Sequence, residues 1–271
     1  RYLINPIEGA WDPTDADQHI PWGQRRFAPA FNAVFGQPNI LGAITEYGTG
    51  NLSKFNELAT QVVHHGNGIT LQASYTLMNA RAFGGIISGA LGGQQAPLAA
   101  GNPDVPYAPI EWAPAAIDER HRVVVSGVIE LPKGFQVSPV FQAASARPYT
   151  ATQGQDLNGD GSNTDLWVNP NLPGNPSAVC GCSLTSGQVV GPMSQRGTPI
   201  INFDTRVTKT IKFTESLKLG LFAEFYNITN RANFGAYYVG NSRASNFRQP
   251  FAFQVGLPTS RQLQLGGRFS F

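Results

Sequence analysis

The sequence predicts an all-β chain of antiparallel strands that cross a membrane as part of a β-barrel. The first observation is a period-two alternation of apolar and polar residues, for example Leu263, Leu265 and Phe269 against Gln262, Gln264 and Arg268. The second is that short and long connections alternate along the chain. A barrel whose outer face meets lipid and whose inner face meets water requires this alternation in strand after strand.

The composition supports this fold class. Only 13% of the 271 residues are charged, compared with roughly 25% in soluble domains. No apolar run approaches the ~18 residues of a spanning helix, and the 30 glycines and 20 prolines favour turns and loops over helices. The net charge is +2 without a concentrated basic patch, so a nucleic-acid partner is not expected.

The first part of the chain, residues 1–52, has aromatic residues scattered among Pro, Gly, Asp and Asn without a sustained period. We expect irregular structure there, with a short strand near residues 39–45. No linker divides the chain, so residues 1–271 are interpreted as a single barrel segment. Because the chain begins at Arg1, we expect either that a leader has been removed or that the chain is a piece of a longer protein.

The first hairpin is predicted from residues 55–65 and 69–78, with Leu58, Thr60 and Val62 on the outer face. Asn67-Gly68 between the two strands is a strong turn signal. His64 and His65 are adjacent, so they point to opposite faces of a strand and do not share one metal ion. Residues 80–119 follow as a long loop, and its glycines lack the Gly-Lys-Ser/Thr ending of a phosphate-binding loop.

The second hairpin is predicted from residues 122–131 and 135–144, joined by the turn Pro132-Lys133-Gly134. Pro139 lies inside the returning strand and cannot donate a ladder hydrogen bond. We therefore expect an edge strand, a bulge or a shortened strand at this position.

The second long loop, residues 150–199, holds a run of oxygen-bearing side chains at alternating positions around glycine. Such a run suits a hard cation such as Ca²⁺, and its candidate ligands are Asp156, Asn158, Asp160 and Asp165. Position twelve of an EF-hand loop is a bidentate Glu, whereas here it is Trp167. A structural ion and an ion-free cluster of Asx turns both remain open. Cys180 and Cys182 in the same loop form either a small disulfide or a free pair without a catalytic role.

The third hairpin is predicted from residues 201–213 and 217–226, followed by a long loop at residues 227–260 and a last strand at residues 262–271. The polar positions of the predicted strands carry seven charged residues that are expected to face the barrel lumen. They are Arg122, Glu130, Arg206, Lys212, Lys218, Glu224 and Arg268.

The alternation of short and long connections predicts on which side of the membrane each connection lies. If Phe271 lies at the periplasmic end, every short turn falls on the periplasmic side and every long loop outside. Aromatic residues near strand ends are expected to form interfacial girdles, with Tyr75, Tyr149 and Tyr226 on the outer side. Seven antiparallel strands leave two unpaired edges, so either a weak eighth strand closes the sheet or it belongs to a larger barrel.

Several segments resemble the carboxy-terminal part of a TonB-dependent outer-membrane receptor, of the Oar-like group with a carboxypeptidase-regulatory-like domain. The resemblance is carried by Lys54-Phe55-Asn56-Glu57-Leu58, Leu71-Gln72-Ala73-Ser74-Tyr75-Thr76-Leu77, Asp118-Glu119-Arg120-His121-Arg122, the 156–165 run, Phe222-Ala223-Glu224-Phe225-Tyr226-Asn227-Ile228-Thr229-Asn230 and Leu265-Gly266-Gly267-Arg268-Phe269-Ser270-Phe271. It implies a bacterial outer-membrane location, contact with outer-membrane lipid, and substrate uptake or translocation powered through the TonB complex.

Two other functions remain open. The alternative membrane protein is a small stand-alone outer-membrane barrel with an adhesin or structural role, and a soluble ligand-binding barrel would turn its apolar faces inward. An enzyme is not expected, because the sequence has no G-x-S-x-G nucleophile elbow and none of the four histidines has an evident triad partner.

Overall fold

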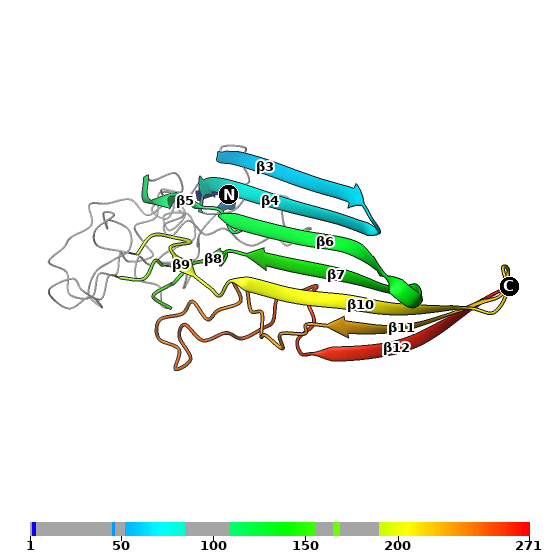
Figure 1. The fold of residues 1–271 in the computed structure, drawn as a ribbon. Helices are drawn as coiled ribbons and strands as arrows, with labels where there is room; N and C mark the ends of the chain where they lie inside the picture. The colour runs from blue at the N-terminus through cyan, green and yellow to red at the C-terminus, as the bar shows by residue number, and fades with distance from the viewer. Residues whose placement is uncertain (1, 4–44, 47–51, 85–108, 155–164, 169–189) are drawn as a thin grey trace, which may run out of the picture.

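Seven long strands form one antiparallel sheet in the computed structural model of the protein (Figure 1). The structure describes residues 2–3, 45–46, 52–84, 109–154, 165–168 and 190–271. The long strands are β3 (Ser53–Gly66), β4 (Ile69–Phe83), β6 (His121–Leu131), β7 (Phe135–Ala144), β10 (Ile200–Lys212), β11 (Lys218–Tyr226) and β12 (Gln262–Ser270). Their order across the sheet is β12-β11-β10-β7-β6-β4-β3. The all-β antiparallel fold class is therefore confirmed.

One face of this sheet is mostly apolar in all seven strands, although Lys54, Asn56, Asn79 and Arg81 share it at the extracellular end of β3 and β4. Residues opposite each other in an antiparallel ladder point to the same side, and the register pairs Leu58 with Leu77, Val125 with Phe141, and Ala223 with Leu265. The predicted outer positions of all seven strands consequently share one face. Many of these side chains are exposed; for example, Leu263 and Leu265 have relative accessibilities of 58% and 72%. A soluble barrel with its apolar faces sealed inside does not match this arrangement.

The three short turns lie where the sequence predicts them. Asn67 and Gly68 both have positive φ, 51° and 73°, as a two-residue type I′ turn requires. The turn between β6 and β7 is the short 3₁₀ segment η3 (Pro132–Gly134). The turn between β10 and β11 is closed by a backbone hydrogen bond of 3.0 Å from Phe213 N to the Leu217 carbonyl. All three lie at the same end of the sheet, in agreement with the predicted topology.

Pro139 does not make β7 an edge or shortened strand, so this prediction is wrong. β7 runs unbroken from Phe135 to Ala144 between β6 and β10, and its register with β6 is the same on both sides of the proline. The β6–β7 ladder lacks pairs only at Gly127 and Val128, which lie opposite Pro139 and Ser138. Gly127 is needed there because an added Cβ would lie 2.5 Å from the backbone carbonyl oxygen of Thr70 in β4. The missing N–H of proline therefore coincides with a local gap in the ladder.

The predicted long loops contain ordered elements that the sequence analysis does not anticipate. β4 continues to Phe83 instead of ending before residue 80, and it pairs with β5 (Trp112–Pro114), which follows the 3₁₀ segment η2 (Pro109–Glu111). Further along, β8 (Pro148–Tyr149) pairs with β9 (Gln195–Arg196). The strand expected near residues 39–45 lies outside the described residues except at its end, where β2 (Thr45–Glu46) pairs with β1 (Tyr2–Leu3).

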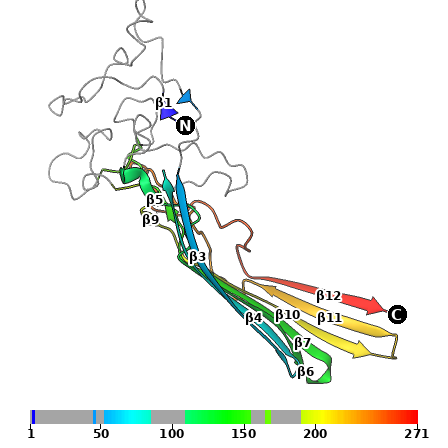
Figure 2. The same ribbon diagram turned by 90° about the horizontal axis from the view of Figure 1, so that it is seen from above.

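The buried core lies at the end of the sheet that carries the long connections. Figure 2 shows β5 and β9 at this end, away from the short turns. Its residues are mostly small: Ala80, Ala82, Ala113, Ala115, Ala144, Tyr149, Ala151, Leu166, Val168 and Ile200. No helix among the described residues is long and apolar enough to cross a membrane.

Candidate functional site

The polar face of the sheet carries the seven charged residues that are predicted to face the lumen. The register places each of them on the side opposite the apolar face, in β6 (Arg122 and Glu130), β10 (Arg206 and Lys212), β11 (Lys218 and Glu224) and β12 (Arg268). The polar face of a membrane barrel lines its interior, so we expect these side chains to line it here. The face is not uniformly polar, because Val124, Val128 and Val140 also lie on it.

Four of the polar-face side chains form a connected group near the middle of β10 and β11. Arg206 Nη1 lies 3.3 Å from Glu224 Oε1, which is its cross-strand partner, and the guanidinium lies 4.0 Å from the centre of the Phe222 ring. The Tyr226 hydroxyl donates a hydrogen bond of 3.1 Å to Glu224 Oε2. The Phe222 ring in turn covers Gly266, where an added Cβ would lie 2.3 Å from the ring. The charges in this part of the interior are therefore neutralised within the sheet.

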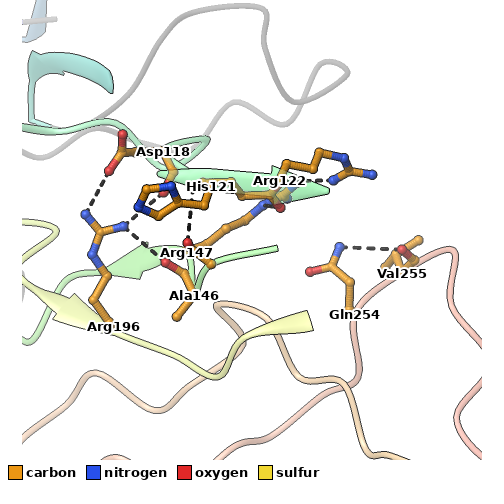
Figure 3. A network of polar contacts seen from close by, with 10 residues as sticks. Asp118, His121, Arg122, Ala146, Arg147, Arg196, Gln254 and Val255 are labelled. Atoms are coloured by element: carbon orange, nitrogen blue, oxygen red, sulfur yellow. Dashed lines mark hydrogen bonds and ion pairs between the residues drawn. The ribbon is translucent and has the colours of Figure 1, made fainter. Parts of the chain in front are cut away.

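A second polar group joins the extracellular ends of the strands to the neighbouring connections (Figure 3). Its centre is formed by Asp118 and Glu119, which directly precede β6 and are only 1% and 3% exposed. Glu119 accepts from Arg122 at 2.9 Å and from Arg147 at 2.6 Å. Carboxylates this deeply buried require partners, because an unpaired buried charge is strongly unfavourable.

Asp118 extends the same group to β9. Its Oδ2 atom accepts from Arg196 at 2.7 Å, and its Oδ1 atom accepts from the backbone N–H of Ala80 at 3.1 Å. Arg196 also donates to the carbonyls of Asp118 and Ala146. The two carboxylates thus tie β4, β6, β9 and the connection between β7 and β8 into one unit. We call Asp118, Glu119, Arg122, Arg147 and Arg196 the extracellular ion-pair network.

The aromatic residues that are expected to form an outer girdle have different positions. Tyr75 lies on the apolar face, and its hydroxyl is 2.8 Å from His121 Nδ1 at the extracellular end. The other two assignments are wrong. Tyr149 is 9% exposed and stacks on Tyr238, whereas Tyr226 shares the polar face with Glu224. The Tyr149 ring therefore contacts another ring, and the Tyr226 hydroxyl bonds to Glu224 on the face opposite the apolar one.

Lys209 is the one charged residue on the apolar face of β10, and the sequence analysis assigned it no role. Its ammonium lies 4.4 Å from the centre of the Phe135 ring and donates a hydrogen bond to the Lys133 carbonyl in the turn. A long side chain that directs its charge to the interface in this way reduces the cost of its position.

Two buried asparagines organise the connection between β11 and β12. Asn227 is fully buried with φ of 47°, and its side chain bonds to the backbone of Arg231 and Pro258. Asn233 bonds through its side chain to both the N–H and the carbonyl of Ile201, at 2.9 and 3.0 Å. Asparagine tolerates positive φ and offers both a donor and an acceptor. Asn233 therefore satisfies backbone groups of β10 beyond the point where its ladder with β11 ends.

The possible Ca²⁺ site remains a prediction. Asp156, Asn158 and Asp160 lie outside the described residues, as do Cys180 and Cys182. Asp165 is buried, and its carbonyl accepts a hydrogen bond of 2.8 Å from Gln153 N. Within the described ranges, no three His, Cys, Asp or Glu side chains are grouped as metal ligands.

No role is predicted from sequence for the carboxylates Asp118 and Glu119 or for their partners Arg147 and Arg196. One signal was available, because five successive polar residues, 118–122, precede a strand in a chain of low charge. The partners are distant, since Asp118 and Arg196 are 78 residues apart. No local pattern predicts such a pairing.

The fold and this polar face define a class: a membrane-spanning antiparallel sheet with short turns at one end and long connections at the other. A family model described as "Outer membrane beta barrel domain" matches residues 4–264. The chain therefore belongs to the outer-membrane β-barrel domain family and is located in the bacterial outer membrane. No curated protein and no solved structure matches it.

Proposed function

We propose that this chain is a segment of a larger, plugged barrel of the TonB-dependent receptor class, which takes up or translocates a substrate across the outer membrane. The observation that carries the proposal is the openness of the sheet. β3 and β12 lie at its opposite edges, and within the described residues neither pairs with the other (Figure 1). Unpaired edges are not tolerated in hydrocarbon, so the complete barrel needs further strands.

The interior face also favours a wide barrel. Barrels of about eight strands fill their interior with their own side chains, whereas barrels of about 22 strands enclose a plugged lumen. Along the membrane-spanning part, polar-face side chains such as Gln264 and Arg268 are exposed. A plug or a solute would contact them in a wide lumen. The sequence resemblance described above points to the same class.

The alternative is a stand-alone barrel with an adhesin or structural role. The observation in its favour is the extracellular end, where the ion-pair network and the buried alanines hold together the described parts of the connections. A rigid surface of this kind suits contact with a large external partner. In both cases we infer a non-catalytic protein.

The test uses the intact gene product purified from outer membranes. Its binding to the purified periplasmic domain of TonB is measured together with the number of strands in its barrel, and a porin from the same membrane is the control. We expect TonB binding and a barrel of about 22 strands. A barrel closed by about eight strands that does not bind TonB would contradict the proposal and favour the stand-alone alternative.

A further inference from the structure

Three cationic side chains gather on the polar face next to the β10–β11 turn. Lys212 and Lys218 are cross-strand partners, and Lys218 is also opposite Ser270. Arg268 lies one polar-face position further along, opposite Gly220. All three cations are exposed on the sheet. We call Lys212, Lys218 and Arg268 the periplasmic cationic cluster, because the short turns lie at the periplasmic end.

The charges of this cluster are not neutralised by the protein. None of the three side chains forms an ion pair or side-chain hydrogen bond with another described residue, although Arg206 and Glu224 pair on the same two strands. Glu215 in the adjacent turn is a carboxylate close to both lysines in sequence, and it forms no ion pair with the cluster either. Like charges directly opposite each other destabilise a sheet. This arrangement is therefore unfavourable unless an external anion compensates it.

The cluster also has room for a ligand. A Cβ added at Gly220 would have a single neighbour within 4 Å, the Arg268 carbonyl oxygen at 3.8 Å. Thr210 lies opposite Gly220 on β10, so a hydroxyl flanks the open position on one side and Arg268 flanks it on the other. The register places ammonium, guanidinium and hydroxyl donors at neighbouring positions of the same face, and such donors bind phosphate and carboxylate.

From this geometry we infer that Lys212, Lys218 and Arg268 bind an oxyanion group, phosphate or carboxylate, of a solute at the periplasmic end of the barrel interior. The inference requires only an outer-membrane barrel, so it holds for both functions considered above. In this position the cluster raises the local concentration of anionic solutes through its electrostatic potential. Its attraction weakens as salt concentration rises.

The test titrates the intact protein in detergent with sodium phosphate and, separately, with tricarballylate, at matched ionic strength against sodium chloride. Isothermal titration calorimetry is the readout. We expect saturable binding of at least one of the two anions, and the tighter one identifies the preferred group. The double variant Lys212→Gln/Lys218→Gln should lose at least about tenfold in affinity. Lys133→Gln, an exposed lysine in the β6–β7 turn, is the matched control and should bind as the parent does.

A melting experiment without added anion distinguishes a bound solute from an acidic segment of the same protein. We expect the double variant to melt at the same temperature as the parent or higher, because it removes like-charge repulsion. Lower stability would show that the lysines are already paired within the intact protein, which overturns the inference. The inference would also be overturned if neither anion bound saturably to the parent. The same holds if the double variant and Arg268→Gln each bound the anion as tightly as the parent does.

Discussion

In the membrane-spanning part of the sheet Leu263 and Leu265 expose more than half of their surface, whereas at the extracellular end Ala80 and Ala82 are fully buried. The two regions share strands but are stabilised differently. The first relies on ladder hydrogen bonds and on lipid as the partner of its apolar face. The second relies on small side chains, buried carboxylates and asparagines that satisfy free backbone groups. The size of the loss on substitution should therefore depend on which of these interactions is removed.

A charge on the lipid-facing side should have the largest effect. Leu265→Arg places a cation near the middle of β12, and we expect a loss of about 2–4 kcal/mol in the free energy of unfolding in lipid vesicles. The neighbouring variant Gln264→Arg points to the polar face beside Glu224, so we expect little loss. Urea titration followed by tryptophan fluorescence measures both. Equal losses for the two variants would show that the faces are assigned wrongly.

Removal of an organising asparagine should be next in size. Asn227→Ala loses the side-chain hydrogen bonds to Arg231 and Pro258 and places alanine at φ of 47°. We expect a loss of about 2–3 kcal/mol in the local stability of the 227–261 connection, measured by hydrogen exchange. Asn227→Gly relieves the backbone strain but also lacks the side chain, so its loss should be smaller. Identical losses would mean that positive φ contributes nothing.

Weakening the ion-pair network should cost less, because its arginines are partly exposed. Glu119→Gln removes the charge that pairs with Arg122 and Arg147, whose side chains are 40% and 27% exposed. We expect a loss of about 1–2 kcal/mol, seen as faster proteolysis near residues 145–154. Glu130→Gln is the control, since Glu130 is exposed and forms no ion pair with a described residue. Faster cleavage in both variants would argue against a specific network.

The smallest effect should come from titration of Tyr149. Burial raises the pKa of Tyr149 above its ordinary value of 10.0, and the nearby Arg248 acts in the opposite direction. Its contribution to stability is therefore complete below pH 10 and is lost as the pH rises through the raised pKa. We expect hydrogen-exchange protection around β8 to fall in alkaline solution, and to fall less in Tyr149→Phe. The same pH dependence in both proteins would exclude Tyr149 as the cause.

The membrane-spanning region was accessible from sequence because its information is local. The alternation at residues such as Leu219, Leu221 and Ala223 predicts directly that they lie on the apolar face. The dipeptide Asn67-Gly68 likewise predicts the turn between β3 and β4. The exception is Pro139, which lies in an unbroken strand opposite Gly127, because strand pairing is not visible in a local pattern.

The extracellular region was largely missed because its partners are far apart in sequence. Arg196 bonds to Asp118 across 78 residues, and Asn233 reaches Ile201 across 32 residues. The extension of β4 through Ala80 and Ala82 was missed for the same reason, since alanine alternation is a weak strand signal and β5 stabilises this end. For the polar face, the period-two alternation predicts which residues lie on it. The pairing of Arg206 with Glu224 cannot be predicted without the strand register.

Lys209 has a consequence for how the protein sits in the bilayer. Its stem lies among lipid-facing residues, but its ammonium is held at the Lys133 carbonyl beside Phe135. Moving the strands outward by a single residue, about 3.3 Å, would carry this periplasmic-end charge towards hydrocarbon, while moving them inward would carry apolar surface into water. We therefore expect this side chain to oppose displacement of the sheet along the membrane normal.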